Sequence, residues 1–216
     1  MKIENLRSEK EGKRIRVSAQ VKWEDCERPT QEIYFETVEE FSNDISCNPN
    51  AFLVACIMPA MRFGERRIFV EEEICPELQD GLATAMGLIC NWFDWYTPES
   101  NTVLIEAKQQ KHVLISSKSP RAGFLFSGGI DSLATLYSNH HHYAAEHPGY
   151  IKDGLLIYGL EVRELNNFEQ VLKSVSILAK DSGVTLIPVY TNVKELGPEN
   201  GKVFWRVLDQ QNHPHA

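Results

Sequence analysis

The sequence has few cysteines, and none of them lies where a metal site or a disulfide framework would need it. The count is odd, no two form a C-x-x-C pair, and all lie in the first half of the chain. They are Cys26, Cys47, Cys56, Cys75 and Cys90. Structural zinc sites use closely spaced pairs of ligands. We therefore expect free thiols in a reducing compartment.

Long hydrophobic runs and an excess of positive charge are missing as well. The charged N-terminal stretch has no apolar segment of the kind found in signal peptides, and no apolar run approaches the roughly 20 residues of a membrane span. Lys and Arg number 22 against 30 Asp and Glu, which gives a net charge of -8. Such an acidic chain does not favour nucleic acid or an anionic membrane as a partner. The expectation is a cytoplasmic protein that binds neither.

The first half of the chain shows a mixture of strand and helix patterns. Residues Arg14–Val21 alternate between apolar and polar, as a half-buried strand does. An amphipathic helix is expected from Pro76 onward, because its apolar residues recur at three- and four-residue spacing. Further strands are expected at Glu32–Val38, Ala51–Met58 and Arg66–Ile74, with a closing hairpin from Asn101–Ala107 and Lys111–Ser117. We interpret residues 1–116 as a smaller α+β accessory domain.

The pattern changes after a polar, proline-containing linker at residues 117–122. Strand, helix, strand, helix and strand then follow one another, which is typical of a parallel sheet with right-handed crossovers. The expected strands are Gly123–Phe126, Asp153–Val162 and Val184–Tyr190, and the expected helices are Ser132–His142 and Asn166–Gly183. The predicted fold class is α/β, with a doubly wound, Rossmann-like (HUP-type) parallel sheet over residues 123–216.

The most informative stretch is FLFSGGIDSLATL, from Phe124 to Leu136. An apolar strand that runs into two glycines and then a helix is a known device for holding anions, because glycine permits close backbone approach and the first turn of a helix offers free N–H groups. Ser127 and Ser132 add hydroxyl donors. Asp131 would hold a cation, most plausibly Mg²⁺, against phosphate oxygens. The alternative is a simple turn in which Asp131 or Ser132 caps the helix.

The six residues SGGIDS (127–132) resemble the S-G-G-x-D-S signature of the PP-loop ATP pyrophosphatases, and they lie in the required strand–loop–helix context. They match neither the G-x-x-x-x-G-K-[ST] nor the G-x-G-x-x-G pattern. The resemblance implies ATP and Mg²⁺ as cofactors, with cleavage between the α and β phosphates. It also implies that Asp131 and Ser127 are catalytic, that Asp131 is the metal ligand, and that the loop residues grip the pyrophosphate. Those loop residues are Ser127, Gly128, Gly129, Ile130, Asp131 and Ser132.

The stretch from Tyr158 to Leu196 is similar to the second half-motif of the 7-cyano-7-deazaguanine synthase and asparagine-synthetase type branch. In that branch the end of the second strand lies beside the adenine, which here implies Tyr158, Gly159 and Leu160. A Thr-Asn pair after the third strand borders the site. The deazaguanine synthases carry a late cysteine cluster for zinc, whereas this chain has no cysteine after Cys90. The departure favours a relative that acts on another acceptor.

These observations give a leading function and two alternatives. The leading one is an enzyme that forms AMP and pyrophosphate while it adenylates a carboxyl or amide-type acceptor for ligation or amidation. The alternatives are a nucleotide-binding interaction module without turnover and a simple ATP hydrolase. The histidines at 140–142 could bind a metal, but neighbouring side chains at a helix end point in different directions.

Only three parallel strands can be counted after the linker, and residues 203–216 have the pattern of an opening helix. In a doubly wound sheet the first strand would be flanked on both sides, so its second edge needs a partner. We expect that the chain is the N-terminal part of a longer protein, or that a strand from the first half or from a second copy in a homodimer completes the sheet. Weak or no turnover is expected from this chain alone.

Overall fold

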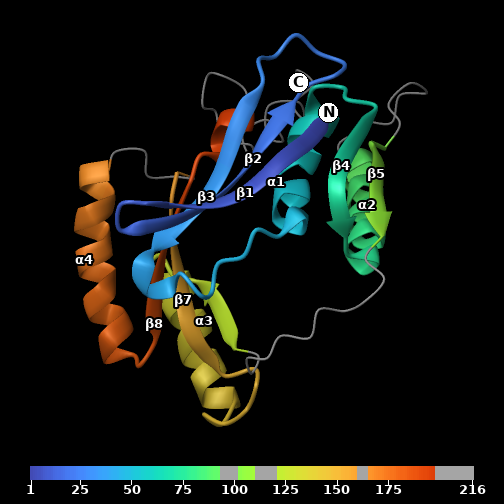
Figure 1. Ribbon diagram of the computed structural model, residues 1–216. Helices are drawn as coiled ribbons and strands as arrows, with labels where there is room; N and C mark the ends of the chain where they lie inside the picture. The colour runs from blue at the N-terminus through green and yellow to red at the C-terminus, as the bar shows by residue number, and fades with distance from the viewer. Residues whose placement is uncertain (93–101, 110–120, 160–164, 198–216) are drawn as a thin grey trace, which may run out of the picture.

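Strands from both halves of the chain form one eight-stranded sheet in the computed structural model, which describes residues 1–92, 102–109, 121–159 and 165–197. The strand order is β5-β4-β1-β2-β3-β8-β7-β6 (Figure 1). Four of these neighbouring pairs are parallel and three are antiparallel. Helices flank the sheet, so the predicted α/β class is confirmed.

The N-terminal half is a three-stranded antiparallel meander followed by a strand–helix–strand unit. Its elements are β1 (Lys2–Glu11), β2 (Arg14–Lys22), β3 (Gln31–Val38), the 3₁₀ helix η1 (Glu39–Phe41), α1 (Pro49–Arg62), β4 (Arg67–Ile74), α2 (Pro76–Trp92) and β5 (Leu104–Gln109). β4 and β5 are parallel, with α2 as the connection between them. One arm of the predicted hairpin is therefore β5, and the other arm, 111–117, lies outside the described residues.

The strand predicted at Ala51–Met58 is wrong, because these residues lie within α1. Asn48 precedes the helix, and its side chain accepts a hydrogen bond from the Asn50 amide, while Pro49 occupies the first turn. Both features are typical helix starts. The buried residues of α1 recur at helical spacing and are Phe52, Leu53, Cys56, Ile57 and Ala60. A continuous apolar run fits a buried strand and a buried helix equally well, and here the cap decides in favour of the helix.

The C-terminal half follows the predicted alternation of strands and helices. Its elements are β6 (Ala122–Leu125), α3 (Ile130–His142), β7 (Ile151–Tyr158), α4 (Leu165–Asp181), β8 (Thr185–Thr191) and the 3₁₀ helix η2 (Val193–Leu196). β6, β7 and β8 are parallel neighbours, as expected for successive crossover units. The helix predicted for residues 203–216 lies outside the described residues. No helix in the described ranges is long and apolar enough to cross a membrane.

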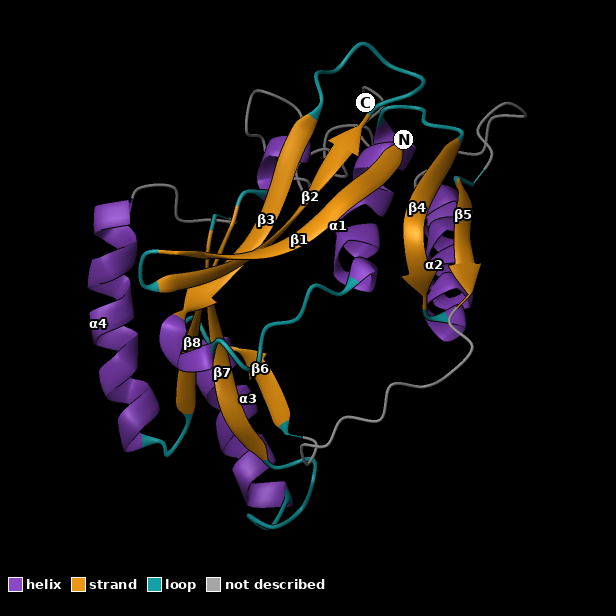
Figure 2. Ribbon diagram, viewed as in Figure 1, coloured by secondary structure: helices purple, strands orange, loops and turns teal. Residues whose placement is uncertain are grey.

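The helices of the two halves cover opposite faces of the shared sheet, as two adjacent residues of β3 show. Phe35 packs into the N-terminal core, with its ring centroid 5.5 Å from that of Phe52 in α1. Tyr34, whose side chain points the other way, packs into the C-terminal core around Phe168 of α4. Figure 2 shows α1 and α2 beside the N-terminal strands, with α3 and α4 beside the C-terminal strands. The two cores therefore lie on opposite faces, and each includes residues of the other half, with Tyr34 in the C-terminal core and Leu196 of η2 in the N-terminal core.

The joint between the halves is the antiparallel pairing of β3 with β8, which covers only three residue pairs, from Phe35↔Thr191 to Thr37↔Val189. Side chains reinforce it. The Thr191 hydroxyl donates to the Tyr34 carbonyl at 2.7 Å, and the Thr37 hydroxyl donates to the Pro188 carbonyl at 2.8 Å. Because the N and the O of a strand residue face the same neighbour, the missing N–H of Pro188 also faces β3. The backbone hydrogen bonds between β3 and β8 therefore end at Pro188.

Asn192 extends the joint beyond the last strand pair. Its Oδ1 accepts from the Tyr34 amide at 3.0 Å, and its Nδ2 donates to the Glu32 carbonyl at 2.8 Å. The Asn192 side chain therefore makes two hydrogen bonds to the backbone of β3, as one further residue of β8 would do in a longer strand pairing.

The described residues show where the N-terminal strands join the C-terminal ones. A strand of the N-terminal half does join the C-terminal strands, but it joins at β8, not at β6. Within the described residues β6 pairs on one side only, with β7. Leu125, which points away from the side chains of Phe124 and Phe126, is 66% exposed.

We expect Asn192→Ala to destabilise the protein by about 1–3 kcal/mol, because it leaves the half-buried Tyr34 amide without its acceptor. Chemical denaturation gives the free energy of unfolding directly. Thr185→Ala, an exposed position in the same strand β8, is the matched control and should change that free energy by no more than about 0.5 kcal/mol. Equal stability of the Asn192 and Thr185 variants would show that the amide contributes nothing to the joint.

Candidate functional site

The SGGIDS loop connects the carboxyl end of β6 to the amino end of α3, as the sequence predicts. Phe126 is fully buried, and its amide donates to the Leu155 carbonyl at 2.8 Å, which fixes the point where the chain leaves the sheet. Gly128 then has a φ of +75°, in the left-handed region that favours glycine. A Cβ at Gly128 would lie 3.1 Å from a methyl carbon of Val175 in α4. The backbone conformation therefore favours glycine there, and a larger residue would also have to displace the Val175 side chain.

Gly129 has a different conformation from its neighbour. It is the residue that caps α3, with φ -77° and ψ 167°, which any residue can adopt. A Cβ there would meet only the Ser127 hydroxyl, at 3.4 Å. The fold itself therefore does not require the second glycine, and a glycine at this position leaves the amino end of α3 open to a ligand.

The two serines of the loop hold its shape from within. The Ser132 hydroxyl is largely buried and donates to the Gly129 carbonyl at 2.8 Å. Ser127 accepts from the Gly129 amide at 3.3 Å, and its oxygen lies 3.5 Å from that of Ser132. Ser127 is exposed, so its hydroxyl is within reach of a ligand, whereas the Ser132 side chain is oriented toward the loop backbone.

The alternative of a simple capped turn finds no support in the geometry. No side chain makes a cap hydrogen bond at the start of α3, and the cap residue is Gly129, not Asp131 or Ser132. Asp131 is exposed in the first turn, and in the described part of the chain no cationic side chain forms an ion pair with it. Ile130, also in this turn, is 80% exposed. Uncapped N–H groups at a helix start are suited to an anion.

The end of β7 lies at the same edge of the sheet, because β6, β7 and β8 are parallel neighbours. Tyr158 is half-buried, and its ring packs 5.3 Å from Phe168 and 5.8 Å from Tyr190. Gly159 follows with φ +100°, and a Cβ there would lie 1.8 Å from the Thr191 carbonyl oxygen. No other residue fits at position 159. The remaining predicted site residue, Leu160, lies outside the described residues.

The Thr-Asn pair at the end of β8 serves the joint between the halves. The side chains of Thr191 and Asn192 both bond to β3, as described above. Their polar groups are therefore directed into the sheet.

The histidines at 140–142 each pack against a different aromatic ring. His140 stacks on Tyr150 at 4.1 Å, His141 stacks beside Tyr137, and His142 meets Tyr143 edge-on, so the three rings point in different directions. Across the described ranges, no group of three or more His, Cys, Asp or Glu side chains is placed to hold a metal ion.

The sequence motifs do not indicate one charged cluster, which lies on the same face of the sheet as α4. Glu36 of β3 is nearly fully buried and accepts hydrogen bonds from Arg14 and Arg16 of β2. Burial raises the pKa of the neighbouring Tyr190, on which Arg14 lies. The available signal was the alternation of Arg14 and Arg16 with Ile15 and Val17, which places both arginines on one face of the strand.

The geometry thus brings Ser127–Ser132, Tyr158 and Gly159 to one edge of the sheet and leaves the amino end of α3 without a cap. No family model, curated protein or solved structure matches this chain.

Proposed function

We propose that the protein binds ATP and Mg²⁺ at the SGGIDS loop and cleaves ATP between the α and β phosphates to adenylate a carboxyl or amide-type acceptor. In this reaction an acceptor oxygen forms a bond to the α phosphorus, and the bond from that phosphorus to the pyrophosphate oxygen breaks. The observation that carries the proposal is the six-residue S-G-G-x-D-S match on a loop that opens an uncapped helix.

The conformation of the loop supports a role in phosphate binding. Left-handed Gly128 turns the chain so that the amino end of α3 follows directly, and Gly129 presents its backbone with no side chain in front of it. The positive end of the helix dipole and its first N–H groups favour a negatively charged group there. The exposed Ser127 hydroxyl is a further donor. These groups would bind the pyrophosphate portion of ATP.

Asp131 is the residue that would hold Mg²⁺. The ion characteristically uses one or two protein carboxylates together with phosphate oxygens and water, so a single exposed aspartate beside a phosphate site fits its preferences. When bound, Mg²⁺ would supply charge neutralisation on the phosphate oxygens. The chain's own contribution is to keep Asp131 in the first turn of α3, where its carboxylate is free of ion pairs in the described part of the chain.

The carboxyl end of β7, at the same edge of the sheet as the SGGIDS loop, would bind the nucleoside part of ATP. In a doubly wound, Rossmann-like sheet, ligands lie outside the carboxyl ends of the strands, and this is where Tyr158 and Gly159 follow β7. The contact of Gly159 with the Thr191 carbonyl keeps the chain close to the sheet at that point. We infer that the backbone at Tyr158–Leu160 meets the adenine edge.

The reaction products separate this proposal from its alternatives. Incubation with radiolabelled ATP and Mg²⁺ in the presence of candidate carboxylates should yield AMP and pyrophosphate. ADP with inorganic phosphate would indicate a simple ATP hydrolase, and binding without products would indicate a nucleotide-binding module.

Asp131→Asn should weaken Mg²⁺-dependent ATP binding by about tenfold or more, since an amide is a poor replacement for a carboxylate ligand. Stability should change by about 1 kcal/mol or less, because the side chain is exposed and bonds to nothing that the fold needs. Calorimetric titration with and without Mg²⁺ measures the first effect. Asp181→Asn, at the far end of α4, removes the same charge and should leave binding unchanged. Unaltered Mg²⁺-ATP affinity in the Asp131 variant would exclude the metal role.

Gly129→Ala should weaken ATP binding by about tenfold or more while the melting temperature stays close to wild type. The backbone conformation at position 129 accepts alanine, so the added methyl group would act mainly on the bound phosphate. Gly87→Ala, on a helix position with open space around it, controls for the change of residue type. If the Gly129 variant binds ATP as wild type does, the loop is only a turn.

A further inference from the structure

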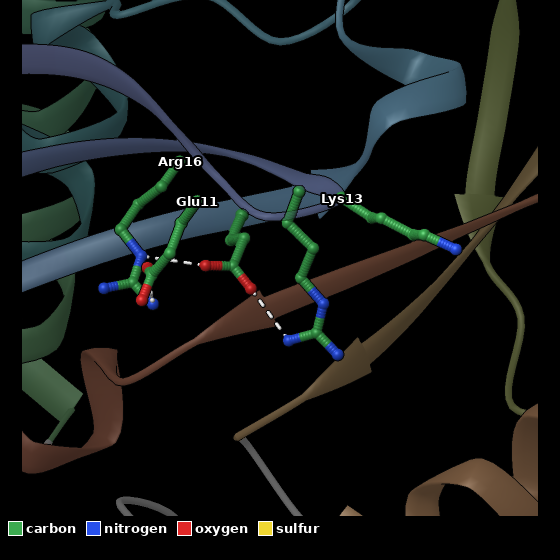
Figure 3. Close-up of a pocket in the computed structure, with 5 residues that line it drawn as sticks. Glu11, Lys13 and Arg16 are labelled. Carbon is green, nitrogen blue, oxygen red and sulfur yellow. Dashed lines mark hydrogen bonds and ion pairs between the residues drawn. The ribbon is translucent and has the colours of Figure 1, made fainter.

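A charged hollow lies at the end of the β1–β2 hairpin, on the face of the sheet that α4 covers (Figure 3). Its volume is about 270 Å³, and its lining residues are Glu11, Lys13, Arg14, Arg16 and Glu36. The pairing of Arg16 with Glu36 across β2 and β3 places these side chains on one face. Three of the five lining residues are cationic, in a chain with a net charge of -8.

Most of this charge is balanced inside the cluster. The Glu36 carboxylate accepts from Arg14 Nη1 at 2.8 Å and from Arg16 Nε at 2.8 Å, and Arg16 Nη2 lies 2.9 Å from Glu11 Oε2. Two arginines thus meet two glutamates. Lys13 is left over, because no carboxylate in the described ranges lies within ion-pair distance of its ammonium group. Figure 3 shows its side chain extended away from Arg16 and Glu11.

The arginines are held rigidly by aromatic rings. The Arg14 guanidinium lies 3.7 Å from the centroid of the Tyr190 ring, and the Arg16 guanidinium lies 4.2 Å from that of Tyr34. Arg14 gives Glu36 one of its N–H groups, and its side chain is 34% exposed, so further donors face the hollow. A guanidinium fixed in this way presents its planar donors to a carboxylate or phosphate with little loss of side-chain entropy.

We propose that the hollow binds the oxyanion end of a small molecule, a carboxylate or a phosphate group, between Lys13 and Arg14. Charge-assisted hydrogen bonds from an arginine fork and a lysine are the usual means of holding such groups. Lys13, which has no ion-pair partner in the described ranges, supplies the lysine. The N–H groups of Arg14 that Glu36 does not use supply the arginine fork, and the buried Glu36 keeps Arg14 in place.

The hollow lies on the same face of the sheet as the core that reaches the ATP-binding loop. Arg14 lies on Tyr190, and the Tyr190 ring lies 5.8 Å from that of Tyr158, directly before Gly159. Tyr190 is buried, so these rings join the hollow to the end of β7 through packed side chains. If the proposed function holds, on which this step rests, the anchored group belongs to the acceptor, and the acceptor carries an anionic group besides the one that is adenylated.

The test uses the whole chain and two separate probes, succinate and inorganic phosphate, with the arginine Nε–Hε signals read by NMR. We expect a saturable shift of the Arg14 signal with at least one probe. Lys13→Gln should weaken that binding about five- to tenfold, whereas Lys10→Gln, which removes the same charge from the same hairpin outside the hollow, should leave it unchanged. Arg14→Lys keeps a cation beside Glu36 but removes the fork, and should also weaken binding.

The two probes and the control variant distinguish the possible ligands and show which result would contradict the proposal. A response to succinate supports a carboxylate-bearing acceptor, and a response to phosphate alone supports a phosphorylated ligand. No saturable shift with either probe, or equal losses in the Lys13 and Lys10 variants, would overturn the proposal. Because neither probe requires ATP, failure of ATP binding at the loop would leave this result standing, and failure here would leave the ATP proposal untouched.

Discussion

The pairing of β3 with β8 is the contact on which the rest of the structure depends. Three residue pairs and the side chains of Thr37, Thr191 and Asn192 form it. Beside it, η2 buries Leu196 in the N-terminal core, and its backbone accepts hydrogen bonds from Arg28 and Gln31. η2 also packs against α1 across this joint. The position of the N-terminal strands relative to the candidate ATP site is therefore set by these hydrogen bonds together with the burial of Leu196.

This joint gives the N-terminal half a specific place beside the candidate site. β3 and β2 extend the sheet from β8, so Glu36 and Arg16 lie level with Tyr190 near the carboxyl end of that strand, and the Arg14 guanidinium lies on the Tyr190 ring. The first half, expected to be a smaller α+β accessory domain, has strands that are continuous with those that carry the loop. A charged hollow from one half and a phosphate-type loop from the other are thus presented on one sheet.

Local patterns were sufficient to predict the C-terminal half. Strand–helix alternation there is built from near-neighbour connections, and the glycine pair at Gly128 and Gly129 marks the loop directly. The errors lie where the sequence pattern is ambiguous or the contacts are distant. The apolar run of α1 is too continuous to show the one-sided hydrophobic pattern of a helix. In the long polar strand β1, apolar and polar residues do not alternate as they do in a half-buried strand. The joint could not be predicted either, since Tyr34 and Asn192 are separated by 158 positions. Nor does a pattern of single residues show that Arg14 will lie on Tyr190.

Pro188 has a consequence for how the molecule avoids self-association. Until β3 arrives, β8 is the outer strand of the C-terminal unit, and outer strands with free N–H groups recruit strands from other chains. The missing N–H of Pro188 lies on that open side, so a foreign strand would find a break in the middle of β8. In the folded protein β3 pairs with the stretch from Val189 to Thr191. The same proline that ends the internal ladder thus interrupts the edge that β8 would offer to any other strand.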